Sequence, residues 1–109
     1  RVSCPPIRGP CFYGIDMSTV AELLIPRYEK EPKKGEVSKE VIAKITKDLG
    51  ADSLRYQSIQ GLVRSIGKPA KDLCMACLTG EYPTPYGKKL YQKAWENFRK
   101  GVKERTYAC

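Results

Sequence analysis

The chain has 109 residues, of which 41% are hydrophobic and 29% are charged, a composition typical of a water-soluble globular protein. No apolar run approaches the roughly 20 residues of a membrane-spanning helix and no secretory signal is visible, so we exclude a membrane protein and expect a cytoplasmic location. The net charge of +8, from 20 basic and 12 acidic residues, favours anionic partners without selecting a class. This length allows one domain at most, and we expect the chain to be part of a longer enzyme.

The first quarter of the chain predicts an ordered loop and then a short helix. Residues 1–17 combine Pro and Gly with apolar side chains, which is typical of a strand end followed by a rigid loop. Ser18 or Thr19 is expected to cap the helix, and Glu22 completes a capping box with Thr19. Pro26 is expected to end this helix.

The middle of the chain predicts an exposed connection followed by a well-defined helix. Residues 27–37 are mostly polar and contain helix breakers, so we expect them to be exposed. Ser38 is placed to cap the next helix, and Gly50 stands where a left-handed C-terminal cap is expected. The apolar positions of this helix, at helical spacing, are Val41, Ile42, Ile45 and Leu49.

A β–α unit is predicted next. Apolar and polar residues alternate over 54–58, which indicates a short strand. Leu62, Val63 and Ile66 then predict a helix that ends near Gly67.

The last third predicts a loop and a long helix. Residues 72–87 carry several Gly and Pro breakers, so we expect irregular backbone that can wrap around a bound centre. Residues 88–105 predict an amphipathic helix whose apolar face includes Tyr91, Trp95 and Phe98. Its other face is basic, with seven Lys or Arg and two Glu in this range.

Five Cys residues offer candidate metal ligands. Their odd number prevents all of them from pairing as internal disulfides. Cys74 and Cys77 have the Cys-x-x-Cys spacing that lets two thiolates converge on one centre in zinc, iron–sulfur and dithiol redox proteins. The redox interpretation is disfavoured because Gly80 and Pro83 follow the pair, where a thioredoxin-type motif would begin a helix.

Zinc and an iron–sulfur cluster remain open from the residues alone. Because the chain has no His, a zinc site would need Cys4 and Cys11 in addition to the later pair. Cys4 and Cys11 are seven residues apart, which is irregular for a zinc ribbon, whereas iron–sulfur clusters tolerate a distant Cys combined with a local pair. We interpret Cys4 and Cys109 as small apolar residues.

Three sequence blocks carry a family resemblance. They are Arg1-Val-Ser-Cys-Pro-Pro-Ile7 running into Pro10-Cys-Phe-Tyr-Gly-Ile-Asp16, then Leu49-Gly-Ala-Asp-Ser-Leu54, then Cys74-Met-Ala-Cys-Leu-Thr-Gly-Glu-Tyr-Pro83. In this order, through about residues 1–85, they resemble the C-terminal third of cluster-containing glutamine amidophosphoribosyltransferases. The connection over 27–37 departs from the relatives, since it is longer and more basic.

The resemblance implies a fold and a cofactor. The expected fold class is helix-rich α/β, the C-terminal part of a type I phosphoribosyltransferase-like domain, with a cluster-binding loop over 72–87 and a basic helix over 88–105. The implied cofactor is a [4Fe–4S] cluster held by Cys11, Cys74 and Cys77, with a fourth Cys ligand outside this chain. Cys4 stands where relatives commonly have Ser, which argues against a ligand role for it.

The resemblance also implies a reaction and partners. The whole enzyme hydrolyses glutamine and passes ammonia to phosphoribosyl pyrophosphate, with Mg²⁺ present, to give phosphoribosylamine for purine biosynthesis. The chain contains no Asp-Asp pair of the phosphoribosyl-binding signature, so we expect no catalytic residue, no Mg²⁺ site and no activity in this segment alone. The implied partners are the upstream glutaminase and phosphoribosyltransferase portions, in the same chain or a separate one, within a homo-oligomer.

Two other interpretations of the sequence stay open. One is a small basic metal-binding module, with zinc or an iron–sulfur cluster, that binds nucleic acid through residues 88–105. Because an aromatic stripe at helical spacing is usually core packing, we favour nucleic-acid binding less than a role in an amidophosphoribosyltransferase. The other is a naturally split subunit that supplies the cluster segment to a separate catalytic chain.

Overall fold

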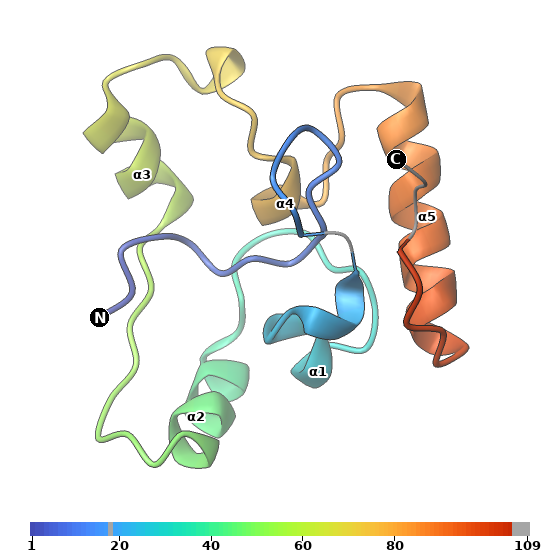
Figure 1. Cartoon of the computed structure of the whole chain (residues 1–109). Helices are drawn as coiled ribbons and strands as arrows, with labels where there is room; N and C mark the ends of the chain where they lie inside the picture. Colours follow the sequence, from blue (N-terminus) through green and yellow to red (C-terminus); the bar gives the residue numbers. More distant parts are fainter. Residues whose placement is uncertain (18, 106–109) are drawn as a thin grey trace. The chain divides into compact units, whose positions relative to one another are not determined.

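Helices dominate the structure. The computed structural model describes residues 1–17 and 19–105 (Figure 1). In order, the elements are η1 (Val20–Glu22), α1 (Ile25–Tyr28), α2 (Lys39–Asp48), α3 (Ile59–Ile66), η2 (Ala70–Asp72), α4 (Ala76–Thr79) and α5 (Pro85–Arg99), where η marks a 3-10 helix. Within the described residues, β structure is limited to two isolated bridges, which join Val2 to Tyr56 and Cys11 to Met17. The prediction of a helix-rich segment with few strands is confirmed.

The chain divides into two compact units, each built from separate stretches of sequence. Unit 1 comprises Arg1–Pro6 and Gly35–Cys74 and contains α2, α3 and η2. Unit 2 comprises Ile7–Lys34 and the described residues from Met75 onward, and it contains η1, α1, α4 and α5. The boundary between the units therefore falls between Cys74 and Met75, within the Cys-x-x-Cys sequence.

In unit 1, α2 has the ends that the sequence predicts. The Ser38 hydroxyl accepts a hydrogen bond from the Val41 N–H at 3.3 Å, which satisfies a backbone donor of the first turn. Gly50, just beyond the helix, has a φ of 64°, in the left-handed region where glycine is favoured. Ile45 is fully buried, as its place on the predicted apolar face requires.

The predicted β–α unit is present in reduced form. The strand expected over 54–58 shrinks to a parallel bridge at Tyr56, since Val2 is the one residue that pairs with it. The Ser58 hydroxyl caps α3 by accepting a hydrogen bond from the Gly61 N–H at 3.0 Å. Gly67 ends α3 with a φ of 70°, as the sequence predicts.

In unit 2, α5 supplies the core. Val20, Ala94 and Trp95 form a buried cluster against which Phe12, Tyr91 and Phe98 pack. The Trp95 ring meets the edges of its neighbours, with ring centroids 6.4 Å from Tyr91 and 5.6 Å from Phe98. The prediction that the aromatic side chains of this helix form a core face is confirmed.

The limits of α5 differ from the predicted range of 88–105. The helix begins at Pro85 because the Thr84 hydroxyl accepts a hydrogen bond from the Gly87 N–H at 3.0 Å and proline suits a first helical position. It ends at Arg99 because Gly101 has a φ of 71° just beyond the C-cap. No helix in residues 1–17 or 19–105 has the length and apolar character needed to cross a membrane.

The helix predicted from residue 18 and ended by Pro26 was wrong in its bounds. The 3-10 helix η1 stops at Glu22, and Thr19 makes no side-chain capping bond, so the predicted capping box is not formed. Pro26 lies in the first turn of α1, where its missing N–H costs no helical hydrogen bond. Ser18, the alternative cap, lies outside the described residues.

Two predicted irregular segments contain structure. Within 72–87, residues Ala76–Thr79 form the one-turn helix α4, and Gly80 caps it with a φ of 76°. Within 27–37, predicted to be exposed, Glu29 is only 6% exposed. Glu29 is buried because it pairs with a residue of the N-terminal loop.

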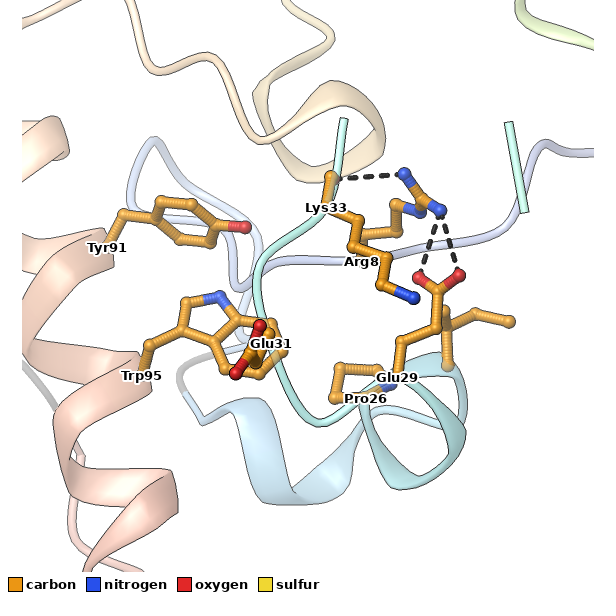
Figure 2. Close-up of a pocket in the computed structure, with 8 residues that line it drawn as sticks. Arg8, Pro26, Glu29, Glu31, Lys33, Tyr91 and Trp95 are labelled. Atoms are coloured by element: carbon orange, nitrogen blue, oxygen red, sulfur yellow. Dashed lines mark hydrogen bonds and ion pairs between the residues drawn. The ribbon is translucent and has the colours of Figure 1, made fainter. Parts of the chain in front are cut away.

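Arg8 is the partner of Glu29, and their two side chains form a buried ion pair (Figure 2). The Arg8 Nη2 donates to both carboxylate oxygens of Glu29, at 3.2 and 2.9 Å, and Nη1 donates to the Lys33 carbonyl at 3.0 Å. Both paired side chains are 5% exposed. The pair therefore fixes the N-terminal loop of unit 2 to the end of α1 and the turn that follows.

We predict that Glu29→Ala lowers the free energy of unfolding of unit 2 by about 3 kcal/mol, because it strands a buried guanidinium. The measurement is urea unfolding followed by the fluorescence of Trp95, the only Trp of the chain. Glu81→Ala is the matched control, since Glu81 pairs with Lys34 where the two side chains are 67% and 81% exposed. The control is expected to cost below about 1 kcal/mol. Equal effects of the two variants would contradict a structural role for the buried pair.

Candidate functional site

Cys11, the first predicted ligand, lies at the start of a tight turn in the N-terminal loop of unit 2. Its backbone N–H donates to the Met17 carbonyl at 2.8 Å, and the Met17 N–H donates to the Ile15 carbonyl at 2.8 Å. Gly14 reverses the chain between them with a φ of 121°, a conformation that favours glycine. The block Pro10–Asp16 thus folds back on itself and holds the backbone of Cys11.

Cys77, the second of the Cys-x-x-Cys pair, is held against the segment that leads into Cys11. Its carbonyl accepts two hydrogen bonds, from the Arg8 N–H at 2.8 Å and the Gly9 N–H at 3.0 Å. Helix α4 is too short to use this carbonyl itself, because its own closing bond runs from Gly80 to Ala76. Figure 1 shows α4 beside the N-terminal loop that supplies the two donors.

Tyr82 makes the next connection between these segments. Its hydroxyl donates to the Pro10 carbonyl at 2.6 Å, and the residue is only 2% exposed. Its ring packs against Phe12 and Tyr91, with centroids 5.2 and 4.7 Å away. The peptide group just before Cys11 is therefore fixed by a side chain that follows α4.

The pKa of the Tyr82 phenol is raised. Burial is the main cause, and negative charge on Tyr91, Cys77, Cys11 or Tyr13 raises the pKa further. The raised pKa also keeps the hydroxyl protonated, so it stays a donor to Pro10.

Gly9 permits the close approach of these segments. A Cβ atom at this position would lie 2.5 Å from the Tyr82 hydroxyl and 3.0 Å from the Tyr91 ring. No other residue type fits there without moving one of the two rings. The Arg8–Glu29 ion pair holds the chain immediately before this glycine.

The other Cys residues have different surroundings. Cys74 is exposed and is the last residue of unit 1. Cys4 is also exposed and lies in unit 1 near Tyr56, whose pKa is raised by burial first and by charge on Cys4 second. Cys109 lies outside the described residues.

The cysteines considered as ligands from the sequence are reduced. Cys4, Cys11, Cys74 and Cys77 form no disulfide. Among residues 1–17 and 19–105, no group of three or more Cys, His, Asp or Glu side chains is arranged to hold a metal ion. The structure holds the Cys77 backbone against Arg8 and Gly9, which shortly precede Cys11 in the chain.

The described pocket of unit 2 beside the ion pair is too small for a substrate. Its volume is about 10 Å³, and Figure 2 shows the side chains around it. The lining residues are Arg8, Ile25, Pro26, Glu29, Glu31, Lys33, Tyr91 and Trp95. A cavity of this volume admits a water molecule at most, so it does not bind a sugar phosphate or an amino acid.

Tyr91, Trp95 and Phe98, the aromatic residues that the nucleic-acid interpretation invokes, are unsuited to stacking on bases. Trp95 is 3% exposed, and Tyr91 and Phe98 pack against the buried core of unit 2. The aromatic residue of α5 outside this core is Tyr86, which is 67% exposed. The packing of the three core residues disfavours the nucleic-acid interpretation.

Sequence reasoning identified the Cys residues and missed the groups that position them. Tyr82 lies within the third sequence block but was given no role, Arg8 and Glu29 lie outside the blocks, and the contacts of these residues span 21 and 72 positions along the chain. One signal was present, since an Arg flanked by an apolar residue and Gly-Pro in an ordered loop is a candidate for a buried pair. No local pattern distinguishes Glu29 from the other acidic residues, of which the chain has 12 in all.

Comparison with known proteins places this geometry in context. The chain is 45% identical over 84 residues to the amidophosphoribosyltransferase of Methanocaldococcus jannaschii, covering 77% of the chain and 15% of that protein. It is 40% identical over 96 residues to the Bacillus subtilis amidophosphoribosyltransferase, covering 84% and 17%. It is 38% identical over 109 residues to that of Staphylococcus epidermidis, covering 96% and 19%. No family model matches the chain, and no solved structure gives a significant match.

The chain spans less than a fifth of the length of the curated relatives that it matches. The similarity extends over most of the chain, with no more than about a quarter left unmatched in these three comparisons. It therefore supports a segment of an amidophosphoribosyltransferase, and the resemblance read from the sequence blocks is confirmed at that level.

We predict that Tyr82→Phe lowers the free energy of unfolding of unit 2 by about 1–3 kcal/mol, because the buried Pro10 carbonyl loses its donor. Tyr86→Phe is the matched control, since Tyr86 is 67% exposed, and it is expected to be nearly neutral. Urea unfolding followed by Trp95 fluorescence measures both.

The same variant tests the raised pKa of Tyr82. A phenol whose pKa is higher in the folded state stabilises the fold below its ordinary value of about 10, and this contribution is lost as pH rises above that value. The free energy of unfolding should therefore fall less steeply above pH 10 in Tyr82→Phe than in the unmodified chain. Parallel pH profiles would contradict the assignment.

Proposed function

We propose that this chain is the C-terminal segment of an amidophosphoribosyltransferase of the iron–sulfur type. In this proposal Cys11, Cys74 and Cys77 supply three ligands of a [4Fe–4S] cluster, and a fourth Cys comes from the upstream part of the enzyme. The segment completes a type I phosphoribosyltransferase-like domain and contains no catalytic residue.

The observation that carries the assignment is the similarity to amidophosphoribosyltransferases over most of the chain. Within the matched relatives the segment is a minor part, so the reaction belongs to the remainder of the enzyme. That reaction is the transfer of glutamine-derived ammonia to phosphoribosyl pyrophosphate, in the first step of purine biosynthesis. We place the enzyme in the cytoplasm as a homo-oligomer, with Mg²⁺ bound outside this segment.

The donor chemistry of the segment fits an iron–sulfur cluster. Thiolates are the ligands that such clusters use, and Cys11 and Cys77 are half-buried and form no disulfide. Cys74 is three residues before Cys77, so their backbones are at most about 11 Å apart. An exposed Cys74 is free to turn toward a shared centre when a metal group is present.

The chain's own residues would hold two of the ligands before any cluster arrives. The two hydrogen bonds to the Cys77 carbonyl and the bond from Tyr82 to Pro10 fix the backbone beside each sulfur. This preorganisation lowers the conformational cost of binding. Neither of these backbone contacts uses a sulfur atom of the two cysteines.

The proposed role of the cluster is structural. When bound, it supplies iron–thiolate bonds that cross-link the chain across a loop of roughly sixty residues, which restricts the unfolded state by several kcal/mol. Because metal binding is then coupled to folding, loss of the cluster by oxidation would destabilise the segment.

We predict that anaerobic reconstitution with iron and sulfide gives a brown protein with equal amounts of iron and sulfide. The chain is used alone and grafted in place of the matching segment of the Staphylococcus epidermidis enzyme, which the similarity covers most fully among the three relatives described. Cys11→Ser, Cys74→Ser and Cys77→Ser in the grafted enzyme should each lower the iron content by at least half and change the visible absorption. The thermal unfolding temperature should fall in the same variants.

Cys4→Ser is the matched control, because Cys4 is a free and exposed thiol of the same segment. It should leave iron content and absorption unchanged. A colourless protein that binds zinc in place of iron contradicts the cluster. An equal loss of iron in Cys4→Ser and Cys11→Ser contradicts the ligand assignment while leaving the enzyme assignment intact.

A further inference from the structure

Helix α3 has a pronounced apolar face that is only partly covered, since Ile59, Leu62 and Val63 are half-buried. Ile59, Leu62, Val63 and Ile66 recur at spacings of three and four and fall on one side of the helix, which we call the α3 face. Gln60, Arg64 and Ser65 lie on the other sides. No residue of α3 is buried, and Ile66 is 48% exposed.

Unit 1 has few buried side chains. Of its described residues, only Pro5 and Ile45 are buried, whereas the other buried apolar residues lie in unit 2. Two buried apolar side chains do not offset the conformational entropy lost by ordering the whole of unit 1. Burial of the α3 face would supply the missing apolar contact.

The extended backbone around Tyr56, just before α3, also has one edge that is open for β pairing. Val2 pairs with one edge of it, since the Val2 N–H donates to the Arg55 carbonyl at 2.8 Å and the Val2 carbonyl accepts from Gln57 at 3.1 Å. The N–H and C=O of Tyr56 therefore point to the opposite edge, where no partner is recorded among the described residues. Parallel strands normally lie within larger sheets that helices cover on their faces.

We propose that the α3 face and the free edge at Tyr56 dock on the remainder of an amidophosphoribosyltransferase, as an added β–α unit on an apolar α/β layer of that part. This inference rests on the proposed function. The relatives are more than five times as long as the matched segment, so a large partner surface lies outside the chain. A β–α unit with a partly exposed apolar helix face and one strand edge open for pairing is complementary to the edge of a sheet.

A second copy of the chain is a poorer occupant. It would offer the same four aliphatic side chains, which make a contact much smaller than the roughly 800 Å² per partner of a stable interface. Its own parallel pairing at Tyr56 would also leave one edge open on each copy.

The first test is co-expression of the 109-residue chain with the part of the Staphylococcus epidermidis enzyme that lies outside the matched segment. We expect the two to co-purify. The double variant Leu62→Lys with Ile66→Lys should lower the co-purified amount at least tenfold, because it places two charges in the contact. The matched control is Gln60→Lys with Ser65→Lys, which adds the same charge to the other sides of α3 and should bind as the unmodified chain does. Circular dichroism and Trp95 fluorescence check that both double variants keep their helices and the core of unit 2.

The second test places a photo-crosslinking amino acid at position 66 or, as a control, at position 60. A crosslink from position 66 to the enzyme remainder supports the α3 face as the contact. A crosslink between two copies of the chain, or equal crosslinking from both positions, overturns it. If the co-purified complex binds iron and neither test favours the α3 face, this inference fails and the proposed function stands. If the unmodified chain does not co-purify and the grafted enzyme binds no iron, both fail.

Discussion

The carbonyl of Cys77, which accepts hydrogen bonds from two consecutive N–H groups, is the constraint on which the rest of the site depends. Those donors belong to Arg8 and Gly9, so the bond pair joins a one-turn helix late in the chain to a loop near its start. A backbone carbonyl with two donors is satisfied without any help from the Cys side chain. The backbone position of Cys77 is thereby held by contacts that do not use its sulfur atom.

The surrounding contacts stabilise this junction between α4 and the N-terminal loop of unit 2. Arg8 contributes its N–H to Cys77 and its guanidinium to Glu29, so one residue links the junction to α1. Tyr82 secures the next peptide group through Pro10, and the small size of Gly9 lets the rings of Tyr82 and Tyr91 approach. A buried ion pair is weak evidence for stability in general, since desolvation opposes its attraction. Here its geometric consequence is clear, because it orients the loop that carries Cys11.

The features that could be predicted from the sequence are those encoded locally. Ser38, Ser58 and Gly67 define helix ends because a cap acts within a few residues of its own position. The aromatic face of α5 follows from spacing along one helix. The pairing of Arg8 with Glu29 and of Tyr82 with Pro10 was beyond prediction, because it depends on which distant segments meet. For the same reason the sequence motif identified Cys11 and Cys77 as candidate ligands without indicating what holds them.

The two units differ in how far they account for their own stability. Unit 2 buries Trp95, Tyr82 and Ile25 among its own residues, and its junction at Cys77 is closed by backbone bonds. The helices α2 and α3 of unit 1 have clear capping signals, yet among the described residues of this unit only Pro5 and Ile45 are buried. Local signals determine where helices begin and end, whereas burial determines whether they persist. The helix ends of unit 1 are therefore encoded locally, while its described residues supply little of the burial that would hold those helices in place, and this contrast is what the proposed docking of α3 would resolve.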